Sequence, residues 1–109
     1  MNTNKIKHIG VFTSGGDSPG MNAALYAIAK SAEAKNIKIS GFQKGYEGLI
    51  DGDLISLKSH ELQKLVHKGG TILKTARSKR FLELEGRKKA LQTIKANNVD
   101  ALIAIGGDG

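Results

Sequence analysis

Residues 9–22 have the sequence Ile9-Gly10-Val11-Phe12-Thr13-Ser14-Gly15-Gly16-Asp17-Ser18-Pro19-Gly20-Met21-Asn22, in which an apolar run, a glycine-rich turn and a helix start follow one another directly. The apolar run over residues 6–12 predicts a buried strand. Gly15 and Gly16 have no Cβ atom, so the backbone can turn sharply there and approach a ligand closely. Pro19 suits a first helical position, and the free N–H groups of a helix that begins there favour an anion. We therefore predict a strand, a phosphate-binding loop and a helix.

The residues after this loop continue an α/β pattern. Apolar side chains recur at helical spacing over residues 21–34, which predicts an amphipathic helix lying on a sheet. Residues 37–42 alternate with period two and predict a second strand, parallel to the first. Three glycines and three carboxylates in residues 45–53 predict a surface loop, and residues 54–57 predict a short extended piece.

The second half of the chain predicts two helices and a last strand. Ser59 is expected to cap a short helix whose buried side is formed by Leu62, Leu65 and Val66. Residues 71–77 are expected to run extended into a loop. A second long amphipathic helix is expected to carry its apolar side chains inward and to stop near residues 97–98; these side chains are Leu82, Leu84, Ala90, Leu91 and Ile94. The apolar run 99–105 is typical of a central parallel strand.

These elements predict the α/β class, as a partial Rossmann-like three-layer sandwich with a mainly parallel sheet. The chain has 109 residues, the size of one domain. Because a parallel strand needs neighbours and a following helix, and the sequence stops in the turn after residue 105, we expect residues 1–109 to be the amino-terminal part of a longer protein.

Composition limits the kinds of partner. Seventeen Lys and Arg against ten Asp and Glu give a formal charge of +7, but two Tyr, three Phe and no Trp leave few aromatics to interleave with a basic face. This argues against nucleic acid, whereas small polyanions and an ordinary solvated surface fit the charge equally well. The absence of cysteine excludes disulfides and cysteine-ligated metals. The apolar runs are too short to span a bilayer and no secretory signal precedes them, so we expect a cytoplasmic protein without a membrane partner.

Two glycine-rich turns carry the candidate chemistry. Residues 15–17 and 106–109 each follow an apolar strand, so both should open at the carboxyl edge of a parallel sheet, where such folds bind ligands. Neither turn matches the Walker loop or the dinucleotide fingerprint. Asp108 is the better candidate for holding Mg²⁺ beside phosphate, since Asp17 can equally cap the helix that follows.

Other polar residues have weaker signals. Arg77 ends a segment in a loop, where it either bridges phosphate groups or is simply solvated. His8, His60 and His67 lack the spacing of metal ligands, which favours structural or exposed positions.

Taken together, the motifs resemble the amino-terminal part of the phosphofructokinase family. The matching segments are Thr13-Ser14-Gly15-Gly16-Asp17-x-Pro19-Gly20-Met21-Asn22, Gly45-Tyr46-x-Gly48-Leu49, Gly69-Gly70-Thr71, Ala76-Arg77, Asp100-Ala101-Leu102 and Gly106-Gly107-Asp108-Gly109. The resemblance implies transfer of the ATP γ-phosphoryl group to fructose 6-phosphate, with Mg²⁺ as cofactor, by a cytoplasmic homotetramer under allosteric control. It makes residues 1–109 part of the ATP-binding domain.

The resemblance also implies roles for individual residues. Catalytic roles fall to Gly16, which contacts the nucleotide phosphates, and Arg77, which bridges the two substrates. Asp108 serves Mg²⁺. The implied nucleotide site comprises Gly15, Gly16, Arg77, Ser78, Gly107, Asp108 and Gly109. Pyrophosphate-dependent relatives tend to have aspartate at the position of Gly109, so glycine favours ATP. A pyrophosphate-dependent enzyme and a non-catalytic nucleotide-binding module are the alternatives.

The sequence departs from the family pattern in three places. Ser78 stands where many bacterial members have phenylalanine. Of the positions aligned with the effector site, Tyr26, Lys30, Ser59 and Lys64, only Lys30 keeps the matching charge, so we expect a weak or altered response to ADP and phosphoenolpyruvate. The family's catalytic base lies in a Thr-x-Asp-x-Asp segment that these residues do not contain, so we expect the chain alone to be inactive.

Overall fold

The computed structural model describes residues 6–14, 20–67, 71–76 and 78–106. These residues form four strands, four α-helices and two 3₁₀ helices. In chain order they are β1 (His8–Ser14), α1 (Met21–Ala34), β2 (Lys38–Phe42), α2 (Tyr46–Asp51), β3 (Leu54–Ser56), α3 (Ser59–Leu62), η1 (Gln63–Leu65), η2 (Arg80–Leu82), α4 (Leu84–Ala96) and β4 (Ala101–Gly106).

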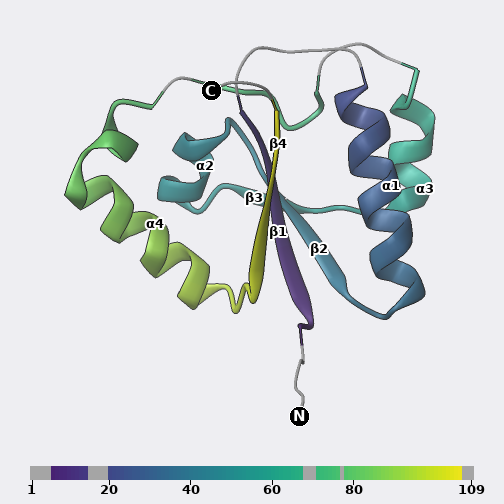
Figure 1. Cartoon of the computed structure of the whole chain (residues 1–109), viewed down its shortest axis with the longest axis horizontal. Coiled ribbons are helices and arrows are strands. Elements are labelled where there is room, and N and C mark those ends of the chain that lie inside the picture. The colour runs from purple at the N-terminus through teal and green to yellow at the C-terminus, as the bar shows by residue number, and fades with distance from the viewer. Residues whose placement is uncertain (1–5, 15–19, 68–70, 77, 107–109) are drawn as a thin grey trace.

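The strands form one mixed sheet with helices on both faces. The strand order is β3-β2-β1-β4, in which β1 is parallel to both β2 and β4, and β3 is antiparallel to β2. Helices α1 and α3 cover one face, and α2 and α4 cover the other (Figure 1). The predicted α/β class, the three layers and the mainly parallel sheet are therefore confirmed.

Each face of the sheet has its own apolar core. Under α1 and α3 the buried residues are Val11, Leu25, Ala29, Ala32, Ile39, Leu57, Leu62 and Leu73. Under α2 and α4 they are Phe12, Phe42, Leu49, Ile50, Ala90 and Val99. Val11 and Phe12 are adjacent in β1 and face opposite ways, so the central strand contributes to both cores.

The first half of the prediction holds except in residues 45–53. Helix α1 spans the predicted apolar repeat, residues 21–34, but its N-cap is Gly20, so it begins two residues after the start expected at Pro19. Strands β2 and β3 lie where extended segments were expected. The predicted surface loop was wrong, because residues 46–51 form helix α2. Gly45 and Gly52 flank this helix with φ of 59° and 74°, and Leu49 and Ile50 are buried. Burial of its apolar side stabilises a helix too short to form alone.

The capping role predicted for Ser59 was also wrong. Lys58 occupies the N-cap position of α3, and Ser59 is the first helical residue. The Ser59 hydroxyl instead donates to the Glu33 carboxylate, 2.6 Å away. Leu62 is buried as predicted, whereas Leu65 and Val66 are only partly buried.

Residues 71–74 form a turn where an extended segment was predicted. Lys74 donates its N–H to the carbonyl of Thr71 at 3.2 Å and adopts a φ of 63°. Leu73 is fully buried between α1 and the sheet core. A loop that contributes a core residue is fixed to the fold.

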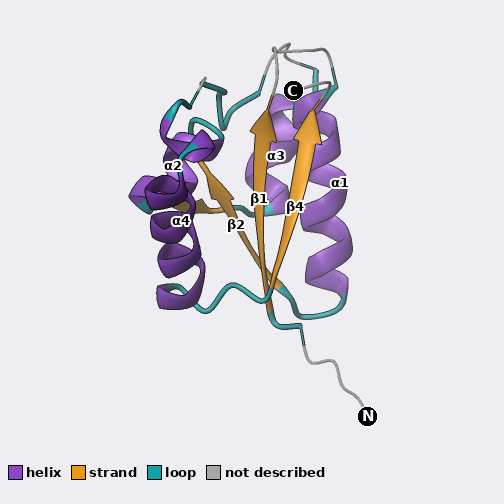
Figure 2. Ribbon diagram, turned by 60° about the vertical axis from the view of Figure 1, so that its left-hand side comes forward, coloured by secondary structure: helices purple, strands orange, loops and turns teal. Residues whose placement is uncertain are grey.

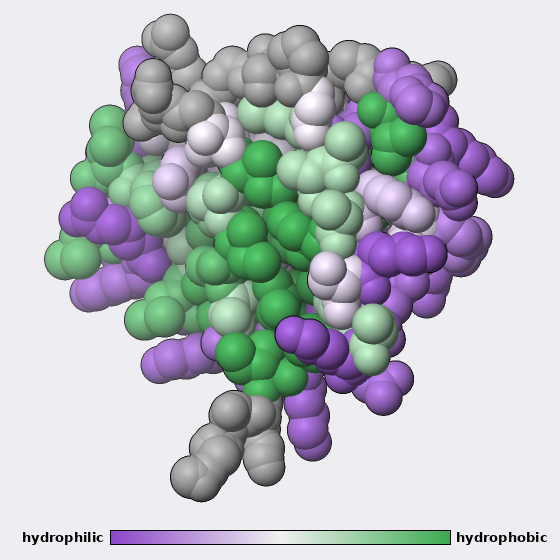
Figure 3. All heavy atoms as spheres, turned by 45° about the vertical axis from the view of Figure 1, so that its right-hand side comes forward, coloured by the Kyte–Doolittle hydropathy of each residue, from purple (hydrophilic) through white to green (hydrophobic). Residues whose placement is uncertain are grey.

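The last helix and strand are less covered than predicted. Helix α4 buries Gly86 and Ala90, while Leu82, Leu84 and Leu91 are more than half exposed. Within the described residues β4 pairs only with β1, so it lies at one edge of the described sheet. The central position predicted for it refers to the sheet of a longer protein and stays a prediction. Figure 3 shows hydrophobic side chains gathered in the middle of the face that carries β4.

Candidate functional site

Strands β1 and β4 end side by side at the carboxyl edge of the sheet. Ser14, the last residue of β1, is the register partner of Gly106, the last residue of β4. Figure 2 shows the ends of β1 and β4 side by side. In the sequence the predicted phosphate loop follows Ser14, and the second glycine-rich turn begins at Gly106. Gly15, Gly16, Gly107, Asp108 and Gly109 themselves lie outside the described residues. The structure thus brings together the strand ends from which both turns begin.

Glycine is required at position 106 by the closeness of these two strand ends. Its φ is +155°, and an added Cβ atom would lie 2.1 Å from the carbonyl oxygen of Ser14. No side chain fits in that space, so the backbones approach as closely as they do only because residue 106 is glycine.

Thr13 ties the segment before Arg77 to the end of β1. Its side chain is fully buried, and its hydroxyl donates to the carbonyl oxygen of Lys74 at 3.0 Å. An added Cβ on Gly45 would lie 3.0 Å from the Thr13 carbonyl and 3.8 Å from that of Ala76. Ala76 therefore lies close to the end of β1. Arg77, the next residue, is outside the described residues.

Ser78 and Arg80 attach the following segment to α2. The Ser78 hydroxyl accepts the N–H of Phe81 at 3.2 Å. The Arg80 guanidinium donates to both oxygens of Asp51, each at 3.0 Å, and to both oxygens of Glu47. Hydrogen bonds from Arg80 and then Ser78 lower the pKa of Glu47, and the hydrogen bond from Arg80 lowers the pKa of Asp51. Both carboxylates are thereby held in the charged form.

An aromatic stack runs alongside this ion pair. Tyr46 lies against Phe12 of β1, with ring centroids 4.9 Å apart, and against Phe81 of η2, with centroids 4.2 Å apart and an interplanar angle of 27°. Contacts of this kind add specific geometry to apolar burial. The strand, α2 and η2 are therefore joined beside the carboxyl edge.

The pairing of Glu47 and Asp51 with Arg80 was missed by sequence reasoning. A signal was present, since Glu47 and Asp51 are four residues apart and would share one face of a helix. It was overlooked because the same residues were assigned to a loop. Their partner Arg80 was given no role.

The histidines have the structural or exposed positions that were predicted. His8 is buried, with Nδ1 3.1 Å from the carbonyl oxygen of Asn97 and Nε2 2.7 Å from the Ser40 hydroxyl. His60 and His67 are exposed. In the described part of the chain, no group of three or more His, Cys, Asp or Glu could hold a metal ion.

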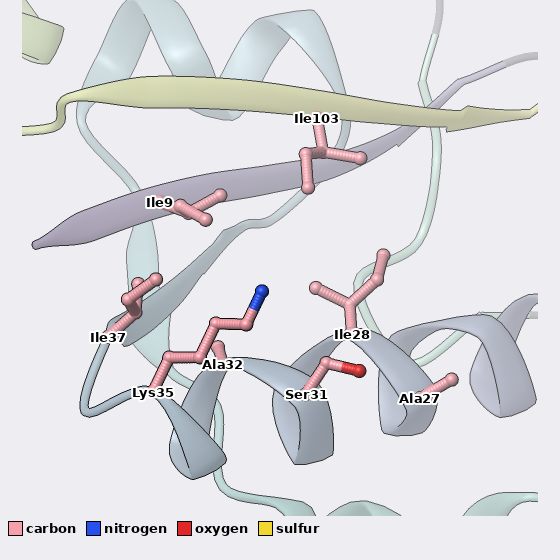
Figure 4. A pocket seen from close by; sticks show the side chains of 8 residues that line it. All are labelled: Ile9, Ala27, Ile28, Ser31, Ala32, Lys35, Ile37 and Ile103. Carbon is pink, nitrogen blue, oxygen red and sulfur yellow. The ribbon is translucent and has the colours of Figure 1, made fainter. Parts of the chain in front are cut away.

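A groove elsewhere in the molecule does not suit phosphate. It has a volume of about 320 Å³ and lies between α1 and the sheet. Figure 4 shows the apolar side chains of Ile9, Ile28, Ile37 and Ile103 around it, with Lys35 at its side. Ile9 and Ile37 lie near the starts of their strands, away from the carboxyl edge. Among the described helices, none has the length and apolar character needed to cross a membrane.

Comparison with known proteins places these features in a family. A family model described as phosphofructokinase matches residues 8–109. The ATP-dependent 6-phosphofructokinase 1 of Thermus thermophilus is 48% identical over 104 residues, which cover 95% of this chain and 32% of that protein. The ATP-dependent 6-phosphofructokinase of Clostridium botulinum is 45% identical over the same share of this chain and 33% of its own length. The chain thus spans about a third of the length of the curated relatives it matches.

Solved structures give the same result. Phosphofructokinase from Pichia pastoris in the T-state matches 99% of this chain and 12% of its own, with a TM-score of 0.90 and 40% identity. A pyrophosphate-dependent phosphofructokinase from Marinobacter aquaeolei matches with a TM-score of 0.79 and 22% identity, which shows a shared fold. With the family model matched from the first strand to the last residue, the chain belongs to the phosphofructokinase family.

Proposed function

We propose that this chain supplies the phosphoryl-donor side of a 6-phosphofructokinase active site, in which the γ-phosphoryl group of ATP passes to the 1-hydroxyl of fructose 6-phosphate. The observation that supports this most directly is the pairing of Ser14 with Gly106, because it starts both glycine-rich turns at one point of the sheet. The carboxyl edge of a parallel sheet is where α/β folds bind their ligands. The ATP-dependent names of the relatives support ATP as the donor.

The proposed roles follow from the chemistry of phosphate binding. Gly15 and Gly16 offer backbone N–H groups at close approach, and α1 adds the positive end of a fourteen-residue helix. Gly107 and Gly109 line the nucleotide site, with Ser78 at its side. Arg77 bridges the phosphates of the two substrates and offsets the charge that develops during transfer.

Asp108 is the residue proposed to hold Mg²⁺. A single carboxylate fits this ion, which usually keeps several waters and shares the rest of its ligands with substrate phosphates. Asp108 follows Gly106 by two residues in the sequence, and Gly106 is the register partner of Ser14, the residue before the phosphate loop. Bound Mg²⁺ would neutralise charge on the phosphate oxygens.

The acceptor side of the reaction is proposed for the complete subunit. The 109 residues contain no Thr-x-Asp-x-Asp segment, which in the family supplies the catalytic base. We therefore expect no turnover in a coupled phosphofructokinase assay of this chain alone, and robust turnover would contradict that division of roles. The cytoplasmic homotetramer belongs to the same proposal.

Isothermal titration with Mg-ATP and with magnesium pyrophosphate tests the donor. The expected result is binding of Mg-ATP that weakens when Asp108→Asn removes the charged ligand and when Arg77→Met removes the bridging cation. Tighter binding of pyrophosphate would favour the pyrophosphate-dependent alternative. ATP binding that is insensitive to Mg²⁺ and to both substitutions would favour a non-catalytic binding module, and no binding of either compound would refute the proposal.

A further inference from the structure

The ion pair on α2 reaches into the segment that carries a proposed catalytic residue. Arg80 lies three residues after Arg77, and its guanidinium spans two carboxylates from successive turns of α2, Glu47 and Asp51. Arg80 is partly exposed, as are both of its partners. An isolated surface ion pair contributes little, but a forked guanidinium between two carboxylates has a fixed geometry.

The helix that holds Arg80 is itself fixed. Leu49 and Ile50 anchor α2 in the core, with 2% and 4% of their surfaces exposed. An added Cβ on Gly48 would lie 1.8 Å from the carbonyl oxygen of Gln43, so the helix packs tightly on the chain that precedes it. A group attached to α2 is therefore attached to the sheet.

Two attachments join residues 78–81 to this helix: Arg80 is paired with both carboxylates, and Phe81 stacks on Tyr46. The Ser78 hydroxyl accepts the N–H of Phe81, so Ser78 is tied to the stacked residue. On the other side of Arg77, Ala76 lies near Gly45, the residue before α2. The chain before Arg77 and the chain after it are thus both attached at residues 45–51.

We propose that Glu47 and Asp51, acting through Arg80, are positioning residues that hold the Arg77 segment in place at the donor site. This inference rests on the proposed function of Arg77. Arg80 itself has its charge offset by these two carboxylates, so its role in the proposal is to hold the segment and not to bind phosphate.

Two neutral, similarly shaped substitutions test the role: Glu47→Gln and Arg80→Met. Hydrogen exchange reports whether residues 78–83 lose protection, and isothermal titration gives the affinity for Mg-ATP. We expect faster exchange in 78–83 and binding weakened by about tenfold, within the loss that a misplaced positioning group causes. The double variant should bind as weakly as Arg80→Met alone, because removing the guanidinium already removes its pairing with Glu47.

Lys79→Met is the matched control, since it removes the same charge from an exposed neighbour in the same segment. If Lys79→Met weakens binding as much as Arg80→Met does, simple charge loss explains the effect and the positioning role is overturned. A thermal melting temperature equal to that of the parent chain shows that the fold is intact, so that a lost affinity reports position.

The outcomes separate the inference from the proposed function. Parent chain that binds Mg-ATP, together with Arg80→Met and Glu47→Gln variants of unchanged affinity, overturns the positioning role and leaves the proposed function standing. Parent chain that binds no Mg-ATP overturns the proposed function and the inference that rests on it. Should Arg80→Met fail to fold, Glu47→Gln and Asp51→Asn decide between these outcomes.

Discussion

The carboxylate of Glu33 accepts two hydrogen bonds from Ser59, one from the backbone N–H at 2.7 Å and one from the hydroxyl at 2.6 Å. These bonds join the last turn of α1 to the first residue of α3, so that two helices on one face of the sheet are held together. The side-chain bond from Ser59, followed by the backbone bond, lowers the pKa of Glu33.

Acid should therefore loosen this pair of helices. A carboxylate whose folded pKa lies below its unfolded value stabilises the fold above the unfolded pKa, and that stability is lost as pH falls through the folded value. Urea unfolding of the parent chain and of Glu33→Gln should differ at pH 7 and converge below the ordinary Glu pKa of about 4.5. Glu61→Gln, an exposed carboxylate on α3, is the control. A difference that is constant from pH 7 to pH 3 would contradict the prediction.

Ser40→Ala should destabilise the chain by about 1–3 kcal/mol, the cost of leaving a buried polar atom without its partner. The carbonyl of Asn97 can only accept, so Nδ1 of His8 carries the hydrogen and Nε2 accepts from the Ser40 hydroxyl. Chemical denaturation measures the loss. Ser31→Ala changes an exposed serine of α1 and is expected to have little effect on stability. Equal losses in both variants would contradict a stabilising role for the buried hydrogen bond between Ser40 and His8.

Leu73→Ala should cost about 2–5 kcal/mol, the range for truncating a buried leucine. This residue belongs to a loop but is 0% exposed, so the prediction separates burial from secondary structure. Leu91→Ala is the matched control, because that leucine lies on a regular helix and is 51% exposed. Its change should stay within about 0.5 kcal/mol. The reverse order of the two losses would show that residues 71–76 are not part of the core.

Gly106→Ala should destabilise the paired ends of β1 and β4 and weaken Mg-ATP binding. The new Cβ atom would lie 2.1 Å from the Ser14 carbonyl, so the two strand ends must separate. Gly20→Ala isolates backbone strain from this clash, since Gly20 has a φ of +92° and nothing lies within 4 Å of its added Cβ. Strain alone costs about 1–2 kcal/mol. We expect the larger loss at position 106, measured by urea unfolding, and an equal loss at both positions would refute the clash.

The periodic spacing of apolar residues was sufficient to predict the long helices and strands. Helix α1 and strand β2 were predicted because each repeats its apolar side chains over several residues, and the parallel pairing of β1 with β2 follows from the helix between them. Helix α2 could not be read in the same way. Gly45, Gly48 and Gly52 resemble a loop in the sequence, yet two of them flank the helix and the third allows it to pack against Gln43.

The candidate site was predictable only in part for a similar reason. That two glycine-rich turns begin at one edge follows from the parallel order of β1 and β4. That Arg80 is paired with carboxylates 29 and 33 positions earlier depends on how η2 packs on α2, and no local pattern records it. The exposed leucines of α4 are a second example. Helical spacing predicts which side chains share the apolar face, but not how much of that face is buried against the sheet.

The outer edge of β4 can pair with a further β-strand. Strand β4 is six residues long and includes Leu102 and Ile103, and the N–H and C=O groups of its outer edge have no strand partner among the described residues. The opposite edge is the three-residue strand β3, which offers few backbone groups for pairing with a strand of another molecule. A strand of another molecule should therefore add to the sheet at β4 and not at β3. In concentrated preparations the first aggregation nuclei should form at β4, and a charged residue placed there would act as a gatekeeper.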